Sequence, residues 1–108
     1  MEQQISLAVD AVVFGYENEQ LNVLLVKQKY GMYKDKWSLP GGFVLKDEGL
    51  TDAVVRELKE EAGITVDYLE QLYTFGDDVK RDKRKHVVSV AYLALVNPEH
   101  LELKANTD

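Results

Sequence analysis

The sequence contains no cysteine, only two prolines, and no hydrophobic run long enough to cross a membrane. The absence of cysteine excludes disulfide bonds and thiolate metal sites. A bilayer-spanning helix needs roughly 20 consecutive apolar residues. The N-terminal stretch MEQQISLAVD also lacks the basic and apolar segments of a signal peptide. These absences favour a cytoplasmic protein that does not bind a membrane.

Basic residues are outnumbered, with 13 Lys and Arg against 19 Asp and Glu and a net charge of −6. Such a domain would repel the backbone of a nucleic acid unless its cations were concentrated on one surface. The one concentration of cations is the stretch KRDKRK at residues 80–85. Two interpretations of it stay open: a solvated hairpin tip, or a contact for a small phosphorylated ligand. We do not expect this chain alone to bind duplex DNA.

The 108 residues suffice for one domain with a modest core. Hydrophobic patterning and turn residues predict the following strands: 6–14, 21–27, 37–39, 66–75 and 86–96. Pro40-Gly41-Gly42 is expected to end the third, and 15–20 is expected to be a polar connection. A helix is predicted from Thr51, as N-cap, to Ala62, with Gly63 ending it in a left-handed conformation. Strands on both sides of one helix predict a mixed α+β or α/β/α domain rather than a parallel Rossmann array.

One face of the predicted helix is strongly acidic. Side chains advance by about 100° per residue, so with Glu57 at zero, Glu61 lies near +40° and Glu60 near −60°. The three carboxylates therefore share a face roughly 100° wide. The apolar stripe expected to pack on the sheet consists of Val54, Val55, Leu58 and Ala62. The acidic face is either a solvated surface or a site for Mg²⁺ or Mn²⁺, which prefer oxygen ligands.

The surrounding sequence favours the metal site. Residues 42–64, GFVLKDEGLTDAVVRELKEEAGI, follow the pattern G-x5-E-x7-REL-x-EE-x-GI. This segment resembles the Nudix box, the signature of the Nudix hydrolase family, at every defined position. The resemblance implies an α/β/α sandwich with a mixed β-sheet, in which the box forms a loop–helix–loop. It also implies hydrolysis of the pyrophosphate bond of a nucleoside diphosphate linked to another moiety, with Mg²⁺ or Mn²⁺ as cofactor.

Roles for individual residues follow from the same resemblance. Glu57 and Glu61 are implied as the principal metal ligands, with Glu60 contributing directly or through water. The carbonyl of Gly41 is implied as a further ligand, because glycine lets the backbone approach an ion closely. The general base is a box glutamate or an acidic residue on another loop.

Arg56 is implied to orient the box glutamates, paired with Glu48, rather than to contact the substrate. Its guanidinium fork suits a fixed carboxylate geometry.

The loop Arg81-Asp82-Lys83-Arg84 resembles the Arg-Asp-Pro-Arg stretch of a subgroup tied to ADP-ribose and NAD metabolism, with Lys83 in place of proline. This implies Arg81, Arg84 and Gly42 as substrate contacts, and ADP-ribose or a related nucleotide sugar as substrate. The aromatic candidates for stacking on a base are Tyr16, Tyr30, Tyr33, Trp37 and Phe75. Of these, Trp37 and Phe75 are expected to pack in the core.

Other functions remain open. The subgroup also resembles the N-terminal half of Nudix-related transcriptional regulators, in which a winged-helix DNA-binding domain follows and the Nudix part senses an ADP-ribose-like ligand. A structural or dimerisation domain that retains the box is a third reading. Residues 1–108 are expected to be one Nudix domain cut short at its C-terminus, because the polar stretch after Asn97-Pro98 replaces the usual closing helix. Family members are often dimers, which makes a homodimer a further expectation.

Overall fold

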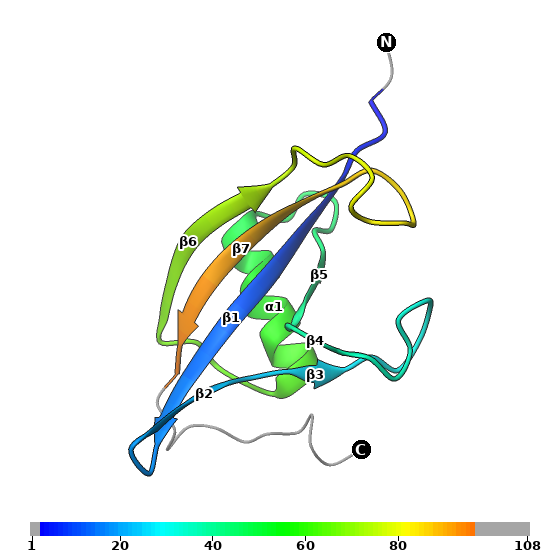
Figure 1. The fold of residues 1–108 in the computed structure, drawn as a ribbon. Helices are drawn as coiled ribbons and strands as arrows, with labels where there is room; N and C mark the ends of the chain where they lie inside the picture. The colour runs from blue at the N-terminus through cyan, green and yellow to red at the C-terminus, as the bar shows by residue number, and fades with distance from the viewer. Residues whose placement is uncertain (1–2, 97–108) are drawn as a thin grey trace.

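The computed structural model describes residues 3–96, which form seven strands and one helix (Figure 1). The elements are β1 (Ser6–Glu17), β2 (Gln20–Val23), β3 (Val26–Lys27), β4 (Trp37–Ser38), β5 (Gly41–Phe43), α1 (Leu50–Ala62), β6 (Tyr68–Phe75) and β7 (Val87–Leu95). No helix in this range is long and apolar enough to cross a bilayer.

Five of these strands form one mixed sheet. Its order is β2-β1-β7-β6, and β5 also pairs with β1. Strands β1 and β7 run parallel over nine residue pairs, and the other neighbours are antiparallel. Strands β3 and β4 form a separate two-stranded sheet. The predicted combination of one helix with a mixed sheet is confirmed.

Helix α1 lies against one face of this sheet (Figure 1). Val54, Leu58 and Ala62 are fully buried there, as predicted. Val55 is 41% exposed, so its assignment to the apolar stripe was wrong. At about +160° from Glu57 it lies beyond the contact, whereas Ala53, near −40°, is buried. The buried arc of α1 therefore includes the direction of Glu57.

Several strand boundaries differ from the expected ones. Strand β1 runs on to Glu17, so the polar connection shrinks to Asn18 and Glu19. Both residues have positive φ, 52° and 63°, as a two-residue hairpin turn with the twist of the flanking strands requires. The strand expected at 21–27 is divided into β2 and β3, because the chain leaves β1 after Leu24, whose N–H donates to Val13, and pairs next with β4.

The two glycines after Pro40 were expected to break a strand, but they form part of one. Gly41 and Gly42 themselves belong to β5, where they pair with Asp10 and Val9. The expected break therefore lies at Leu39 and Pro40, between β4 and β5.

The two ends of α1 differ in how well they were predicted. The helix begins at Leu50 with Gly49 as N-cap and no side-chain cap, so Thr51 as N-cap was wrong. The Gly49 carbonyl accepts the first helical bond, from Ala53 N–H at 2.9 Å. Gly63 ends the helix with φ 66°, as predicted, and its N–H donates to the Lys59 carbonyl.

The sheet face opposite α1 carries no helix within residues 3–96. Trp37 is 57% exposed and Phe75, on β6, is 45% exposed, so the expectation that they pack in the core was wrong. Trp37 lies in the small separate sheet, and Phe75 lies on an edge strand whose residues are nearly all exposed. Residues 97–108, on which the expected truncation of the domain was based, lie outside the described residues.

Candidate functional site

Helix α1 and strand β5 meet at two glycines. A Cβ atom at Gly42 would lie 2.7 Å from Oε1 of Glu57 and 2.8 Å from its Cδ. A Cβ at Gly41 would overlap the backbone oxygen of Val9 and lie 2.7 Å from Oδ1 of Asp10. At Gly41 the overlap is with backbone, so only glycine fits there, whereas at Gly42 a Cβ would displace the end of the Glu57 side chain.

Glu61 is fixed to the same strand. Its Oε1 accepts a hydrogen bond from the Gly41 N–H at 2.8 Å. Pro40 and Val44 bond to β1, so the alternation of an antiparallel ladder turns the peptide groups of Gly41 away from β1. The Gly41 carbonyl is thereby left outside that ladder, beside the helix that carries Glu61.

Glu61 is partly buried beside the carboxylates of Glu57 and Asp10. The pKa of Glu61 is raised to about 8, mainly by burial and further by the hydrogen-bonded contact with Glu57 and the charge of Asp10. The hydrogen bond from the Gly41 N–H acts in the opposite direction and lowers this pKa. Unfavourable burial and like charge of this kind are relieved by a bound cation.

The donor set fits a hard divalent ion. Glu57, Glu61 and the Gly41 carbonyl are oxygen donors, the type that Mg²⁺ and Mn²⁺ prefer. No three His, Cys, Asp or Glu side chains within residues 3–96 form a ready-made metal-binding group. Mg²⁺ typically binds through one or two carboxylates and completes its shell with substrate phosphates and water. Two carboxylates and a carbonyl therefore suffice.

Arg56 makes hydrogen bonds to several residues of the box. Its Nε and Nη2 donate to the two oxygens of Glu48 at 2.6 and 3.0 Å, and Nη1 donates to Glu57 at 2.7 Å. Nη2 also donates to the Phe43 carbonyl at 3.1 Å. The hydrogen bonds from Arg56 hold the pKa of Glu48 below its usual value. The expected Arg56–Glu48 pair is thus present, and the guanidinium is occupied by protein groups.

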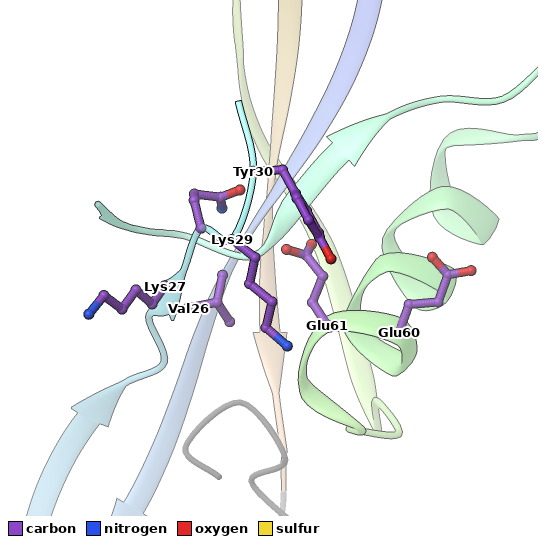
Figure 2. A pocket seen from close by; sticks show the side chains of 7 residues that line it. Val26, Lys27, Lys29, Tyr30, Glu60 and Glu61 are labelled. Carbon is purple, nitrogen blue, oxygen red and sulfur yellow. The ribbon is translucent and has the colours of Figure 1, made fainter. Parts of the chain in front are cut away.

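Glu60 lies apart from the other two glutamates. Figure 2 shows it pointing away from Glu61, and 62% of its side chain is exposed. Its one hydrogen bond within the described residues is from Arg56 Nη1 at 3.3 Å. In the same view Glu61 points into a cleft of about 250 Å³, between α1 and residues 26–30, with the exposed ring of Tyr30 beside it.

Asp10 is a residue that the sequence reasoning missed. It lies on β1 opposite Gly41, half-buried, and its charge acts on Glu61. Burial raises the pKa of Asp10, and the positive charge of Arg81 partly offsets this. A signal was present in the sequence, because a charged residue in the middle of the apolar strand SLAVDAVVF is out of pattern.

A larger cleft, of about 520 Å³, adjoins the same glycines. Its lining includes Gly41, Gly42, Asp10, Arg81 and Arg84. Side chains alternate between the two faces of a sheet. Asp10 and its pairing partner on β7, Ala91, alternate with core residues that pack against α1, so the cleft lies on the opposite face. Both arginines of the loop at residues 80–85 line this cleft, which also borders Gly41 and Gly42.

The two arginines are held differently. Arg81 donates from Nη2 to Oγ of Ser89 at 2.9 Å. Arg84 donates from Nε and Nη2 to both oxygens of Asp82, at 2.9 and 2.6 Å. Arg84 also lies over the rings of Tyr33 and Phe43, with centroid distances of 5.5 and 5.1 Å.

Comparison with known proteins agrees with this geometry. The model of the NUDIX domain family matches residues 5–108. The chain belongs to the Nudix family. The resemblance seen in the box, and the assignment to a subgroup with ADP-ribose pyrophosphatases and Nudix regulators, are both confirmed.

Three relatives show where in the Nudix family the chain lies. It is 40% identical over 93 residues to the ADPR responsive transcriptional repressor NtrR of Acinetobacter baylyi, covering 84% of this chain and 37% of that protein. It is 36% identical over 103 residues to the ADP-ribose pyrophosphatase of Methanocaldococcus jannaschii, covering 95% and 57%. The cocrystal structure of the NUDIX domain of Shewanella oneidensis NrtR complexed with ADP ribose matches at a TM-score of 0.83 and 39% identity, covering 96% and 68%. The chain therefore spans only 37% to 57% of the length of these two curated relatives.

Proposed function

We propose that this Nudix domain, residues 1–108, is the catalytic part of a pyrophosphohydrolase that uses Mg²⁺ or Mn²⁺ to cleave ADP-ribose or a related nucleoside diphosphate derivative. The observation that carries the proposal is the pair Glu57 and Glu61, set against Gly41 and Gly42 beside a cleft with two arginines. The substrate class is supported by the ADP-ribose pyrophosphatase and the ADP-ribose complex among its relatives.

In this proposal some residues of the box bind the metal ion, and others keep those ligands in position. Glu57, Glu61 and the Gly41 carbonyl would hold the metal, and Glu60, which points away from Glu61, would contribute through water. A divalent ion held there would supply positive charge for the phosphate oxygens and a lowered pKa for a water molecule. Arg56, braced by Glu48 and the Phe43 carbonyl, keeps the Glu57 carboxylate in place. A box glutamate or another acidic residue accepts the proton of the attacking water.

The larger cleft holds the rest of the substrate. Arg81 and Arg84 contribute positive charge, and Gly42 lets a phosphate approach the backbone closely. Tyr33 also lines this cleft, with the Arg84 guanidinium over its ring, and the exposed ring of Tyr30 at the smaller cleft is available for stacking on a base.

The test is release of a nucleoside monophosphate from a panel of ADP-ribose, NADH, nucleotide sugars and dinucleoside polyphosphates, with Mg²⁺, with Mn²⁺ and with EDTA. We expect metal-dependent turnover of ADP-ribose or a nucleotide sugar, abolished by EDTA. Absence of turnover across the panel, together with tight binding of ADP-ribose, would overturn the enzymatic assignment.

A second candidate is an ADP-ribose-sensing domain of a transcriptional regulator. The 40% identity to the NtrR repressor favours it. Binding and hydrolysis use many of the same residues, so calorimetric binding of ADP-ribose without turnover, and a winged-helix segment elsewhere in the parent gene, distinguish the sensor from the enzyme. Either protein is compatible with a homodimer, which sedimentation equilibrium tests.

A further inference from the structure

Ser89 is the one buried polar side chain among residues 3–96, with 5% of its surface exposed. It interrupts the otherwise apolar strand VVSVAYLAL of β7. A buried hydroxyl without a hydrogen-bond partner destabilises the fold. The partner here is Arg81, whose Nη2 donates to the Ser89 Oγ at 2.9 Å. The serine is therefore satisfied only while the arginine reaches back over the sheet.

Arg81 is restrained by three neighbouring strands. Phe75 of β6 pairs with Ser89 of β7, and its ring centroid lies 5.9 Å from the guanidinium carbon. On β1, Ala8 pairs with Ser89, and Asp10 two residues further attracts the guanidinium by its charge. The Ser89 bond uses one N–H group, and the guanidinium has no other hydrogen bond to the described residues. Its remaining donors are available to a ligand in the cleft.

Arg84 is in the opposite situation. Asp82 neutralises it through two side-chain bonds, and the Asp82 side chain is only 11% exposed. The backbone N–H of Arg84 also donates to Asp82, at 2.9 Å. The guanidinium of Arg84 lies over the rings of Tyr33 and Phe43, and this contact with Phe43 connects the loop at residues 80–85 to β5.

We propose that Ser89 is a positioning residue that sets the Arg81 guanidinium in the cleft as the contact for a ligand phosphate, while Arg84 anchors the loop. The inference rests on the proposed function and deepens it, because it separates the two arginines that the function treats alike. A phosphate contact needs a guanidinium with a fixed orientation and free donors. Both arginines are oriented by side-chain bonds, but Arg84 is already neutralised by the Asp82 carboxylate, whereas Arg81 has no carboxylate bonded to it among residues 3–96.

The first test measures ligand binding and turnover. Ser89→Ala should raise the KM for ADP-ribose, and its Kd, roughly tenfold, as expected for loss of a hydrogen bond to a charged group, with kcat much less affected. Ser89→Thr keeps the hydroxyl and should restore most of the affinity. Thr65→Ala, which removes an exposed hydroxyl between α1 and β6, is the matched control.

A double-mutant cycle separates positioning from packing. If Ser89 acts only through Arg81, Ser89→Ala combined with Arg81→Ala should bind no more weakly than Arg81→Ala alone. Ser89→Ala combined with Arg84→Gln should instead be additive. Additive losses in the Arg81 pair, or no rescue by Ser89→Thr, would overturn the proposal.

A second measurement does not depend on the function. In ¹⁵N NMR spectra of the ligand-free chain, the Arg81 guanidinium should show restrained side-chain rotation that Ser89→Ala abolishes and Ser89→Thr retains. An unchanged Arg81 signal in Ser89→Ala would refute the positioning role whatever the substrate. A wild-type protein that binds no member of the panel would refute the proposed function and leave this result to decide the inference.

Discussion

Glu57 and Glu61 project from the part of α1 that faces the sheet. On the helical wheel, Glu57 at zero and Glu61 near +40° fall between the buried residues Ala53, near −40°, and Val54, near +60°. Each carboxylate is therefore partly desolvated and lies against a glycine of β5. The spacing of the glutamates in the sequence predicted a common face. It could not predict the burial, which depends on how closely β5 approaches the helix.

We expect Glu61→Gln to lower turnover by several orders of magnitude without loss of stability, because the metal needs the charge and the fold does not. The pKa of Glu61 is raised in the folded state. Folding thus favours the protonated form, and this stability is complete below the ordinary carboxyl pKa and is lost as pH rises toward about 8. Glutamine has no such loss.

Urea unfolding in EDTA checks this. The variant should be more stable than the wild type at pH 9, and the difference should disappear near pH 5. A variant that is less stable at pH 9 would show that the carboxylate is a structural partner instead.

Gly42→Ala should weaken metal binding more than it weakens the fold. The new Cβ would lie within 3.0 Å of all three terminal atoms of Glu57, which must move away from β5. We expect at least a tenfold rise in the Kd for Mn²⁺, equal to about 1.4 kcal/mol, measured by electron paramagnetic resonance. Gly76→Ala is the control, because its Cβ would only make ordinary contacts of 3.4 Å or more with Val88. Equal affinities in the two variants would contradict the place given to Glu57.

At the scale of elements, the long regular pieces were predictable, whereas among the strands of two or three residues only β4, expected at 37–39, was found in its place. Strands β1, β6 and β7 and the helix carry enough apolar or amphipathic pattern to be found from the sequence. Strands β3, β4 and β5 have two or three residues each, too few for any period to show. Their positions depend on which partner strand is in reach, and β5, which supports the carboxylates, belongs to this group.

The ends of α1 allow a prediction about stability. Gly63→Ala should destabilise the chain by about 1 kcal/mol, because an alanine there must keep φ near 66° in the left-handed region. Gly49→Ser should stabilise it by a few tenths of a kcal/mol, since the N-cap lacks a side-chain acceptor. Room exists for the serine, as the nearest atom to a Cβ at Gly49 is 3.8 Å away. Chemical denaturation of both variants tests this, and a neutral Gly63→Ala would show that the helix end relaxes freely.

At the scale of the whole molecule, the cleft is assembled from segments that are distant in the sequence. Asp10 comes from β1, the glycines from β5, and Arg81 from the loop before β7. The box motif located the carboxylates, and the Arg-Asp-Lys-Arg resemblance located the arginines. Neither gave Asp10 or Ser89, because their roles arise from the parallel pairing of β1 with β7, which no local pattern encodes.

The distribution of charge also bears on nucleic acids. The charged residues that line the larger cleft are Asp10, Asp82, Arg81 and Arg84, so their formal charges cancel. Arg84 is already paired with Asp82, and Arg81 is directed onto the sheet. The basic stretch 80–85 therefore presents fewer free cations than its sequence implies, on a chain whose net charge is −6.

We accordingly expect this chain by itself not to bind duplex DNA at physiological salt. Phosphate contacts supply most of the non-specific affinity of proteins for DNA, and they require several uncompensated cations on one surface. Fluorescence anisotropy with a labelled duplex, at 50 and 150 mM salt, measures this directly, and Asp82→Asn provides the comparison because it releases Arg84. Weak binding that appears only in the variant and at low salt would support the charge balance described here. Salt-sensitive binding by the wild type would instead identify the loop at residues 80–85 as a nucleic-acid surface.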